Sequence, residues 1–230
     1  MRRLILFDID GTLLQSASAG RRAIEAAFAE EYEDTGFFDA VRFDGKTDPQ
    51  IVRELYVAAG HPDRATVDRT DTLLGRYLAH LERELGERGH LVRTLPGIME
   101  LLAALEARDD VLVGLLTGNV VAGARLKLGA AGIGFERFAL GAYGSDSGHR
   151  PDLPAIAAAR AEPFLGRIPT GHEVVILGDT PADVTCGAAI GARAVAVATG
   201  SYQVAELDAA GAYRSFDTFA DTAAVLEALL

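Results

Sequence analysis

The 230-residue sequence contains only one cysteine, Cys186, and only two lysines, Lys46 and Lys127. A single cysteine excludes an intramolecular disulfide and fits a reducing compartment. The sequence also lacks an apolar run that could span a bilayer. The first apolar stretch, which begins at Leu4, ends at Asp8 and is too short for a secretory signal. We therefore expect a cytoplasmic protein that does not enter a membrane.

Positive charge is scarce as well. Lys and Arg number 22 against 33 Asp and Glu, which gives a formal net charge of -11. Neither a nucleic acid nor an anionic membrane surface is expected as a partner of such an acidic chain. A phosphorylated ligand would need a local cation, a metal ion or helix amino termini to attract it. Low-complexity segments and internal repeats are absent, and a hydrophobic content of 49% is sufficient for a core.

The spacing of apolar residues divides the chain into two kinds of pattern. Residues 3–9 are typical of a short buried strand, whereas residues 15–88 have helical spacing throughout. One helix there is expected to begin at Asp48-Pro49, with Asp48 as its cap. From residue 98 onward strands and helices alternate. We expect helices at 98–107, 120–128, 154–161 and 182–190, and strands at 111–117, 138–141, 174–178 and 194–198.

This alternation with short links predicts an α/β fold, a Rossmann-like parallel sheet with helices on both faces. Because the helical stretch interrupts the sheet after its first strand, we expect two domains. Residues 1–14 and 94–230 would form the core, and residues 15–93 an inserted α-helical domain. Ligands of such sheets bind beyond the carboxyl ends of the strands.

The first expected strand ends in Asp8-Ile9-Asp10-Gly11-Thr12. Residues two apart on an extended chain point the same way, so the carboxylates of Asp8 and Asp10 can share one site. Gly11 then allows the chain to turn away sharply. The alternative is an acidic turn without a function, because a single Asp-x-Asp often occurs by chance.

Three further segments follow expected strands or precede a helix. Thr117, Gly118 and Asn119 offer a hydroxyl, an amide and free N–H groups at a helix amino terminus, which suit an anion. Arg150, in the loop before the 154–161 helix, could contact a phosphoryl group through its forked guanidinium. Alternatively, these residues are an ordinary helix cap and a solvated loop arginine.

The last segment, Gly178-Asp179-Thr180-Pro181-Ala182-Asp183, follows a strongly apolar strand. Asp179 lies where a hard cation could collect oxygen ligands together with Asp8. Thr180 and Asp183 also form a capping arrangement, and Asp183 could support the site from behind. Each segment alone has a purely structural explanation. Their occurrence in this order, each near a strand end, favours a shared catalytic site.

Together these segments resemble the haloacid dehalogenase superfamily, and within it the phosphoglycolate phosphatase-like branch. The resemblance implies that Asp8 attacks phosphorus and becomes an aspartyl phosphate, and that Asp10 is the general acid and base. It implies a magnesium ion held by the Asp8 side chain, the Asp10 carbonyl and Asp179, with Thr117, Gly118 and Asn119 binding the phosphoryl group. True dehalogenases of the superfamily usually lack the second aspartate, so Asp10 favours phosphate chemistry.

The sequence departs from the family pattern at the basic position, which is commonly Lys-Pro and is Arg150-Pro151 here. Arginine keeps the charge, and we therefore expect Arg150 to balance the phosphoryl group. Lys127 is the competitor. It lies about two turns along its helix, roughly 12 Å from the amino end at ~1.5 Å per residue, and this distance argues against it.

The insert at 15–93 resembles the helical cap that closes over the active site in this group, with residues 43–48 as its substrate-facing loop. Lys46 could contact a substrate carboxylate or second phosphate, or it could simply be solvated. A Schiff-base lysine there would instead indicate a phosphonoacetaldehyde hydrolase, and a phosphomutase would use the same core. Cys186 is expected to be a core residue.

From a different functional class, a phospho-aspartate signalling receiver is less favoured, because receivers are about half this length and lack the insert. We expect a small phosphorylated metabolite as the partner. A monomer and a homodimer both fit the sequence.

Overall fold

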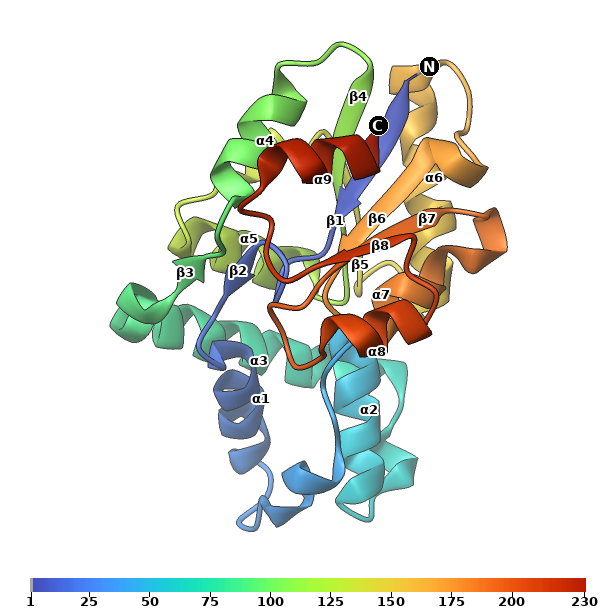
Figure 1. Ribbon diagram of the computed structural model, residues 1–230. Coiled ribbons are helices and arrows are strands. Elements are labelled where there is room, and N and C mark those ends of the chain that lie inside the picture. Colours follow the sequence, from blue (N-terminus) through green and yellow to red (C-terminus); the bar gives the residue numbers. More distant parts are fainter. Residues whose placement is uncertain (1) are drawn as a thin grey trace.

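The structure is a computed structural model that describes residues 2–230, and its centre is a six-stranded sheet (Figure 1). All neighbouring strands run parallel in the order β5-β4-β1-β6-β7-β8. Both faces of the sheet are covered, which explains the uninterrupted apolar sequence of the central strands. The predicted fold class is confirmed. The strands are β1 (Arg3–Phe7), β4 (Val111–Thr117), β5 (Leu140–Tyr143), β6 (Val174–Gly178), β7 (Arg193–Val197) and β8 (Arg214–Phe216).

Alternate residues of β1 point to opposite faces of the sheet, and each face has its own layer of helices. Ile5 and Phe7 pack with α4 (Ile98–Glu106), α5 (Val121–Ala130) and α9 (Thr222–Leu229). Leu4 and Leu6 pack with α6 (Leu153–Leu165) and α7 (Pro181–Cys186). A further helix, α8 (Val204–Ala209), packs against β7 and β8.

The helical insert lies beyond the carboxyl ends of the strands (Figure 1). It contains α1 (Ala19–Ala29), α2 (Asp48–Ala58) and α3 (Val67–Arg88), which share a separate apolar cluster around Phe28, Tyr56 and Tyr77. The chain enters and leaves it through an antiparallel pair of short strands, β2 (Leu14–Gln15) and β3 (Arg93–Thr94). No helix within residues 2–230 combines the length and the apolar character that crossing a bilayer requires.

Several expected boundaries were wrong. The strand expected at 138–141 lies at 140–143, and the helix expected at 182–190 ends at Cys186 and continues as a 3-10 helix, Gly187–Ile190. Gly187 packs so closely on Ile176 and Ala192 that an added Cβ would lie 2.7 Å from the Ile176 Cδ1. The strand β8 and the helices α8 and α9 were not predicted, because β8 has only three residues and both helices are short.

The start of α2 also differs from the expectation. Thr47, not Asp48, is the N-cap, and its Oγ1 accepts a hydrogen bond of 3.2 Å from the Gln50 N–H. Asp48 is the first helical residue and Pro49 the second. Since Thr47 caps the helix, the carboxylate of Asp48 is free for a different contact.

Candidate active site

The predicted site residues converge at the carboxyl edge of the sheet. Asp8 and Asp10 follow β1, Thr117 to Asn119 end and follow β4, and Asp179 follows β6. Arg150 reaches the same place from a 3-10 helix in the loop after β5. All of these side chains, together with Lys46 and Lys127, line one pocket of about 690 Å³ between the sheet and the helical insert. Asp183 contacts the pocket-lining residues Thr180 and Arg150 from the side away from the pocket.

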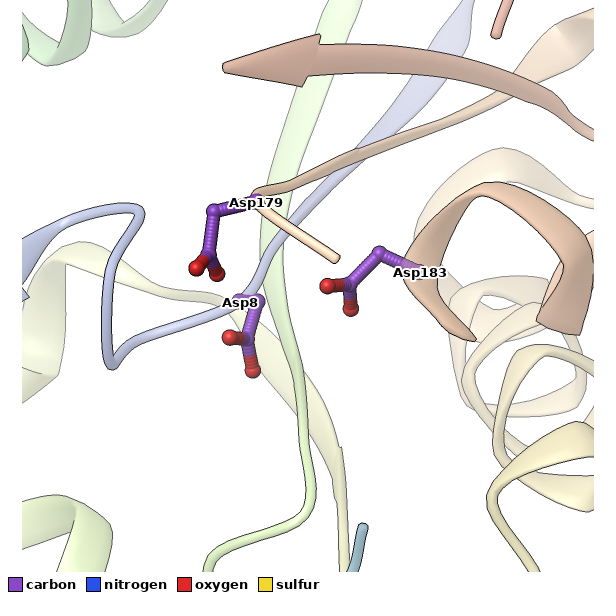
Figure 2. Close-up of side chains that lie close together, drawn as sticks. All are labelled: Asp8, Asp179 and Asp183. Carbon is purple, nitrogen blue, oxygen red and sulfur yellow. The ribbon is translucent and has the colours of Figure 1, made fainter. Parts of the chain in front are cut away.

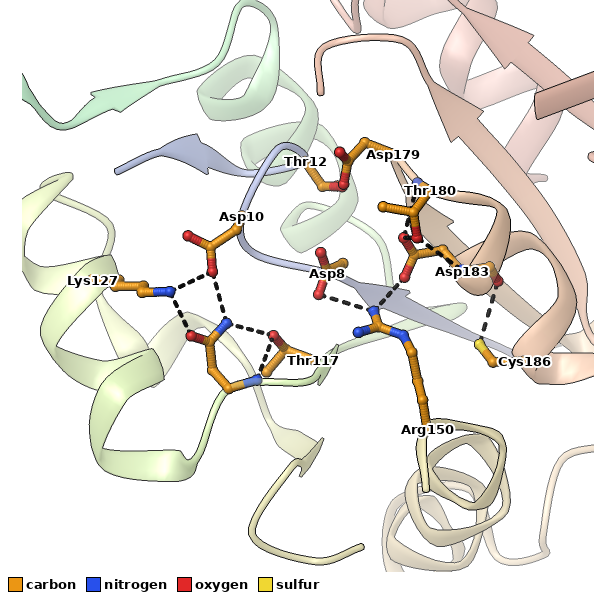
Figure 3. A network of polar contacts seen from close by, with 11 residues as sticks. Asp8, Asp10, Thr12, Thr117, Lys127, Arg150, Asp179, Thr180, Asp183 and Cys186 are labelled. Atoms are coloured by element: carbon orange, nitrogen blue, oxygen red, sulfur yellow. Dashed lines mark hydrogen bonds and ion pairs between the residues drawn. The ribbon is translucent and has the colours of Figure 1, made fainter. Parts of the chain in front are cut away.

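Asp8 is almost completely buried, at 6% exposure. Its backbone N–H donates to the Leu177 carbonyl at 2.9 Å, which continues the pairing of β1 with β6 beyond the strand end. Arg150 Nη2 lies 3.1 Å from Asp8 Oδ1 and also forms an ion pair with Asp183 (Figure 3). Burial, and then repulsion by Asp183, raise the pKa of Asp8 to about 7 in spite of Arg150.

Asp8, Asp179 and Asp183 form an acidic cluster in which one carboxylate oxygen of each lies within 4.8 Å of the others (Figure 2). Burial and the charges of Asp183 and Asp8 hold the pKa of Asp179 well above its usual range. Asp179 fits against Gly11 and Gly200, where any side chain would overlap with its carboxylate. Crowded carboxylate oxygens with a single buried arginine among them are a donor set that fits a divalent cation.

Asp183 has less freedom than the other two members of the cluster. Its Oδ2 accepts hydrogen bonds from the Thr180 N–H at 3.0 Å and the Thr180 hydroxyl at 2.6 Å, and its Oδ1 accepts one from Arg150. Thr180 in turn caps α7 by accepting from the Asp183 N–H, so the capping arrangement expected from the sequence is present. Because both oxygens of Asp183 already have donors, Asp8 and Asp179 are the more available ligands.

Asp10 has a different environment from Asp8 (Figure 3). Its Oδ2 accepts from Lys127 Nζ at 2.6 Å and from Asn119 Nδ2 at 2.8 Å, and its Oδ1 accepts from Ser16 Oγ at 3.0 Å. Asn119 Nδ2 also lies 2.8 Å from Thr117 Oγ1. Burial would raise the pKa of Asp10, but the nearby Lys127 charge and these hydrogen bonds lower it below its usual value.

The expectation that Lys127 lies too far from the site was wrong. Lys127 is 5% exposed, and its ammonium contacts both Asp10 and the Asn119 Oδ1, the latter at 2.7 Å. Side chains of a helix lean toward its amino terminus, and the four-carbon stem of lysine then covers the remaining distance along α5. Burial would lower the pKa of Lys127, but the carboxylates of Asp10 and Asp48 raise it, so this lysine remains charged.

Two of the N–H groups at the start of α5 already have partners. The N-cap of α5 is Val120, whose N–H donates to Asp48 Oδ2 at 2.9 Å. The next N–H, of Val121, donates to Ser145 Oγ at 3.4 Å. The anion site suggested by the sequence therefore retains the Thr117 hydroxyl, the Asn119 amide and the Gly118 backbone, but the Val120 and Val121 N–H groups donate to protein oxygens.

Lys46 lines the pocket, and its ammonium forms an ion pair with Glu54 of α2. Sequence reasoning missed four residues at the site: Ser16, Asp48, Glu54 and Tyr77. Glu54 lies eight residues after Lys46, a separation of about two helical turns. This spacing does not predict the ion pair between them, because Lys46 precedes α2 and its direction depends on the turn before the helix. Nothing in the sequence distinguishes Ser16 from other loop serines.

The fold and the carboxylates at the carboxyl edge of its central strands define an α/β enzyme of the Rossmann-like type. The chain belongs to the haloacid dehalogenase-like hydrolase family, whose model matches residues 2–191. The predicted family and enzyme class, a phosphatase of this type, are thereby confirmed.

Similar proteins agree with this placement. A phosphoglycolate phosphatase of Rhodospirillum rubrum is 29% identical over 227 residues, which cover 96% of this chain and 89% of the relative. One from Cereibacter sphaeroides is 29% identical over 197 residues, 82% of each protein. Among solved structures, a hydrolase from Pseudomonas syringae has a TM-score of 0.74 at 23% identity and covers 99% of this chain and 98% of its own. CbbY from Rhodobacter sphaeroides, bound to xylulose-(1,5)bisphosphate, has a TM-score of 0.72 at 21% identity, covering 96% of both chains.

Proposed function

We propose that the chain is a Mg²⁺-dependent phosphatase that hydrolyses a small, phosphoglycolate-like organophosphate through an aspartyl phosphate on Asp8. The observation that carries the proposal is the pairing of each aspartate after β1 with its own cation. Asp8 is paired with Arg150, and Asp10 is paired with Lys127. The names of the relatives that match most of the chain support the substrate class.

Asp8 is the nucleophile. One of its oxygens forms a bond to phosphorus, and the bond between phosphorus and the ester oxygen of the substrate breaks. Phosphoryl transfer requires positioning and neutralisation of charge more than it requires covalent chemistry. The buried guanidinium of Arg150 provides both, because it holds an Asp8 oxygen at 3.1 Å and carries a fixed positive charge beside the reacting atoms.

Asp8, Asp179 and the backbone carbonyl of Asp10 would hold the magnesium ion, and Asp183 would fix Arg150 and Thr180 behind them. When bound, the ion neutralises charge shared between the nucleophile and the phosphate. The positive charge of a bound ion would offset the burial and the neighbouring negative charges that raise the pKa of Asp8 and Asp179, so that Asp8 would be ionised and able to attack at neutral pH.

Asp10 is the general acid for the leaving oxygen and then the general base for the hydrolytic water. In the free enzyme its carboxylate accepts hydrogen bonds from Lys127 and Asn119. An incoming phosphate ester competes for these donors, and its negative charge raises the pKa of Asp10. Substrate binding therefore favours the protonated form that the first step requires.

The remaining predicted residues bind the substrate. The Thr117 hydroxyl, the Gly118 backbone and the Asn119 amide hold the phosphoryl oxygens, because they are the donors that end and follow β4. Residues 15–93 form the cap domain over the pocket. Within the cap domain, Lys46 binds the carboxylate of the substrate. To do so, Lys46 exchanges its ion pair with Glu54 for an ion pair with the substrate.

A panel of phosphorylated metabolites, assayed for release of inorganic phosphate with Mg²⁺, tests the proposal. We expect small carboxylate-bearing monophosphates such as phosphoglycolate to be the best substrates, and a phosphoenzyme that disappears in Asp8→Asn. Isomerisation of a sugar phosphate without phosphate release would identify a phosphomutase instead. Absence of any turnover on the panel, with the fold intact, would contradict the assignment.

A further inference from the structure

The helical insert is attached to the sheet at a second place, besides the β2–β3 pair. The segment that leads into α2 lies directly on the loops after β4 and β5. The Asp48 N–H donates to the Gly118 carbonyl at 2.8 Å, and the Thr47 hydroxyl donates to the Gly148 carbonyl at 3.0 Å. Thr47 is fully buried and Asp48 is 7% exposed, although both belong to a loop-to-helix junction.

The approach of the two backbones is so close that it requires glycine. A Cβ on Gly118 would overlap with the Lys46 carbonyl and lie 3.0 Å from the Thr47 Cα. A Cβ on Gly45 would lie 3.1 Å from the Thr180 Oγ1. Two residues that contact the insert thus belong to the site: Gly118 is part of the phosphate-binding loop, and Thr180 donates to Asp183 of the acidic cluster.

Asp48 is the charged residue at this contact. Its Oδ2 accepts from the Val120 N–H, one residue after Asn119, and its charge acts on Lys127. Val120 is itself part of the apolar cluster of the insert, together with Tyr77. One carboxylate of the insert is therefore connected, through Val120 and directly, to two of the three residues that donate to Asp10, namely Asn119 and Lys127.

We infer that Asp48 is a positioning residue: its hydrogen bond to Val120 fixes the insert and the phosphate-binding loop in one shared arrangement. The inference rests on the proposed function, since it gives the Thr117–Asn119 loop its role. Two hydrogen bonds join Asp48 to the loop after β4. The Asp48 N–H donates to the Gly118 carbonyl, and the Val120 N–H donates to the Asp48 carboxylate, so the two bonds close a ring between the insert and this loop. When the insert moves away, both bonds break, and Asn119 loses its support at the same moment. Closure of the pocket and alignment of its donors are then one event.

The test compares Asp48→Ala, which removes the acceptor, with Asp48→Asn, which keeps an oxygen acceptor of the same reach. Activity and hydrogen–deuterium exchange are measured for both variants. For Asp48→Ala we expect kcat/KM to fall roughly tenfold to a hundredfold, the range for a lost hydrogen bond to a charged group. Exchange should rise together in residues 43–50 and 117–122, while residues 78–88 in the carboxyl-terminal half of α3 remain protected. Asp48→Asn should stay close to wild type in both measurements.

A general loss of stability would raise exchange throughout the insert, so the joint and local rise is specific to the inferred role. Wild-type exchange or wild-type kcat/KM in Asp48→Ala overturns the inference. Equal damage in Asp48→Asn overturns it as well, because the charge toward Lys127, and not the bond to Val120, would then be what matters. Asp63→Asn, an exposed aspartate of the insert, is the matched control and should change neither measurement.

Gly118→Ala gives an independent test if Asp48→Ala does not fold. Its methyl group would push the Lys46 carbonyl away while Asp48 stays intact, and exchange in residues 43–50 should rise as in Asp48→Ala. Unchanged exchange there contradicts the inference. The exchange measurements need no turnover. They therefore remain decisive even if Asp8→Asn is active and the proposed function fails.

Discussion

Lys127 Nζ lies 2.6 Å from Asp10 Oδ2, and the two residues are separated by 117 positions in the sequence. Arg150 forms the corresponding pair with Asp8, which is only two residues from Asp10. Two adjacent carboxylates of one loop therefore have different cations and opposite changes in pKa: that of Asp8 is raised and that of Asp10 is lowered. Environments that separate the pKa values of two carboxylates are typical of a pair with different catalytic roles.

The two aspartates can be tested separately. We expect Asp8→Asn and Asp10→Asn to reduce hydrolysis of a generic aryl phosphate by roughly a thousandfold or more, because each removes a reacting group. Phosphoenzyme trapping should fail in Asp8→Asn. Circular dichroism verifies the fold of both variants. Turnover within about tenfold of wild type in either one would contradict its assigned role.

The two cations should respond differently to substitution. Arg150→Lys should retain much more activity than Arg150→Ala, since charge is the main requirement and Arg150→Ala also leaves Asp8 and Asp183 buried without a partner. Lys127→Met should raise the pKa of Asp10, so that the alkaline limb of the profile of kcat/KM against pH moves to higher pH. An unmoved limb would show that Lys127 does not control Asp10.

Removal of the metal should abolish activity and reduce stability. The acidic cluster of Asp8, Asp179 and Asp183 is crowded, and a cation bound only to the folded state raises the melting temperature. We expect Mg²⁺ to restore both after chelation. Ca²⁺ should restore stability but little activity, since calcium takes more oxygen ligands at longer distances and would displace Asp8. Full activity in excess chelator would exclude the metal role of Asp179.

Stability should depend on pH through Asp48. Burial raises its pKa to about 6, against the attraction of Lys127 and the bond from the Val120 N–H, and the charge of Asp10 acts in the same direction as burial. The folded state then binds a proton more tightly than the unfolded state. This stabilisation is complete below the unfolded pKa of 3.8 and is lost as the pH rises through about 6.

Compared with Asp48→Asn, the wild type should lose up to about 3 kcal/mol of unfolding free energy from below pH 3.8 to well above pH 6, at about 1.4 kcal/mol per unit of pKa, and roughly half of this loss falls between pH 5 and pH 7.5. Urea unfolding from roughly pH 5 to pH 7.5 measures the difference between the two proteins. A difference that does not change with pH would mean that Asp48 is ionised at its ordinary pKa.

Lys46 separates the phosphatase from the carbon–phosphorus hydrolase. Lys46→Ala should mainly raise KM for a carboxylate-bearing monophosphate and leave a generic aryl phosphate nearly unaffected. Glu54→Gln, which releases Lys46 from its ion pair, should lower that KM. Because the Lys46 side chain is paired with Glu54 and would have to leave this partner, we expect no Schiff base. A borohydride-trapped peptide containing Lys46 after incubation with phosphonoacetaldehyde would replace the phosphatase proposal.

Local patterns predicted the sheet and the convergence of Asp8, Thr117 and Asp179, because both depend on features that neighbouring residues determine. A strand end, a turn glycine and an Asp-x-Asp pair can be recognised within a few positions. The carboxyl ends of parallel strands then meet at one edge whatever the details of packing. Thr180 and Asp183 were predictable for the same reason, since their mutual bonds span three residues.

The position of Lys127 could not be predicted, because it depends on how a long side chain extends back over its own helix toward a loop far away in the sequence. The same holds for Asp48. Its position at the start of a helix suggested a cap, and only the docking of the insert provides its actual partner, Val120. Contacts between the insert and the sheet involve few residues with no sequence pattern, so the structure was needed to find them.

The strand order has a consequence for biosynthesis. β1 lies between β4 and β6, so its partners begin at Val111 and Val174. At about 5–20 residues per second, a ribosome completes α1 to α3 seconds before either partner is available. The apolar stretch Leu4 to Phe7 must therefore wait unpaired beside a nascent helical unit. Such long-range parallel pairing is slow and leaves unpaired strands open to aggregation, so β1 is exposed in this way during synthesis until Val111 and Val174 have been added.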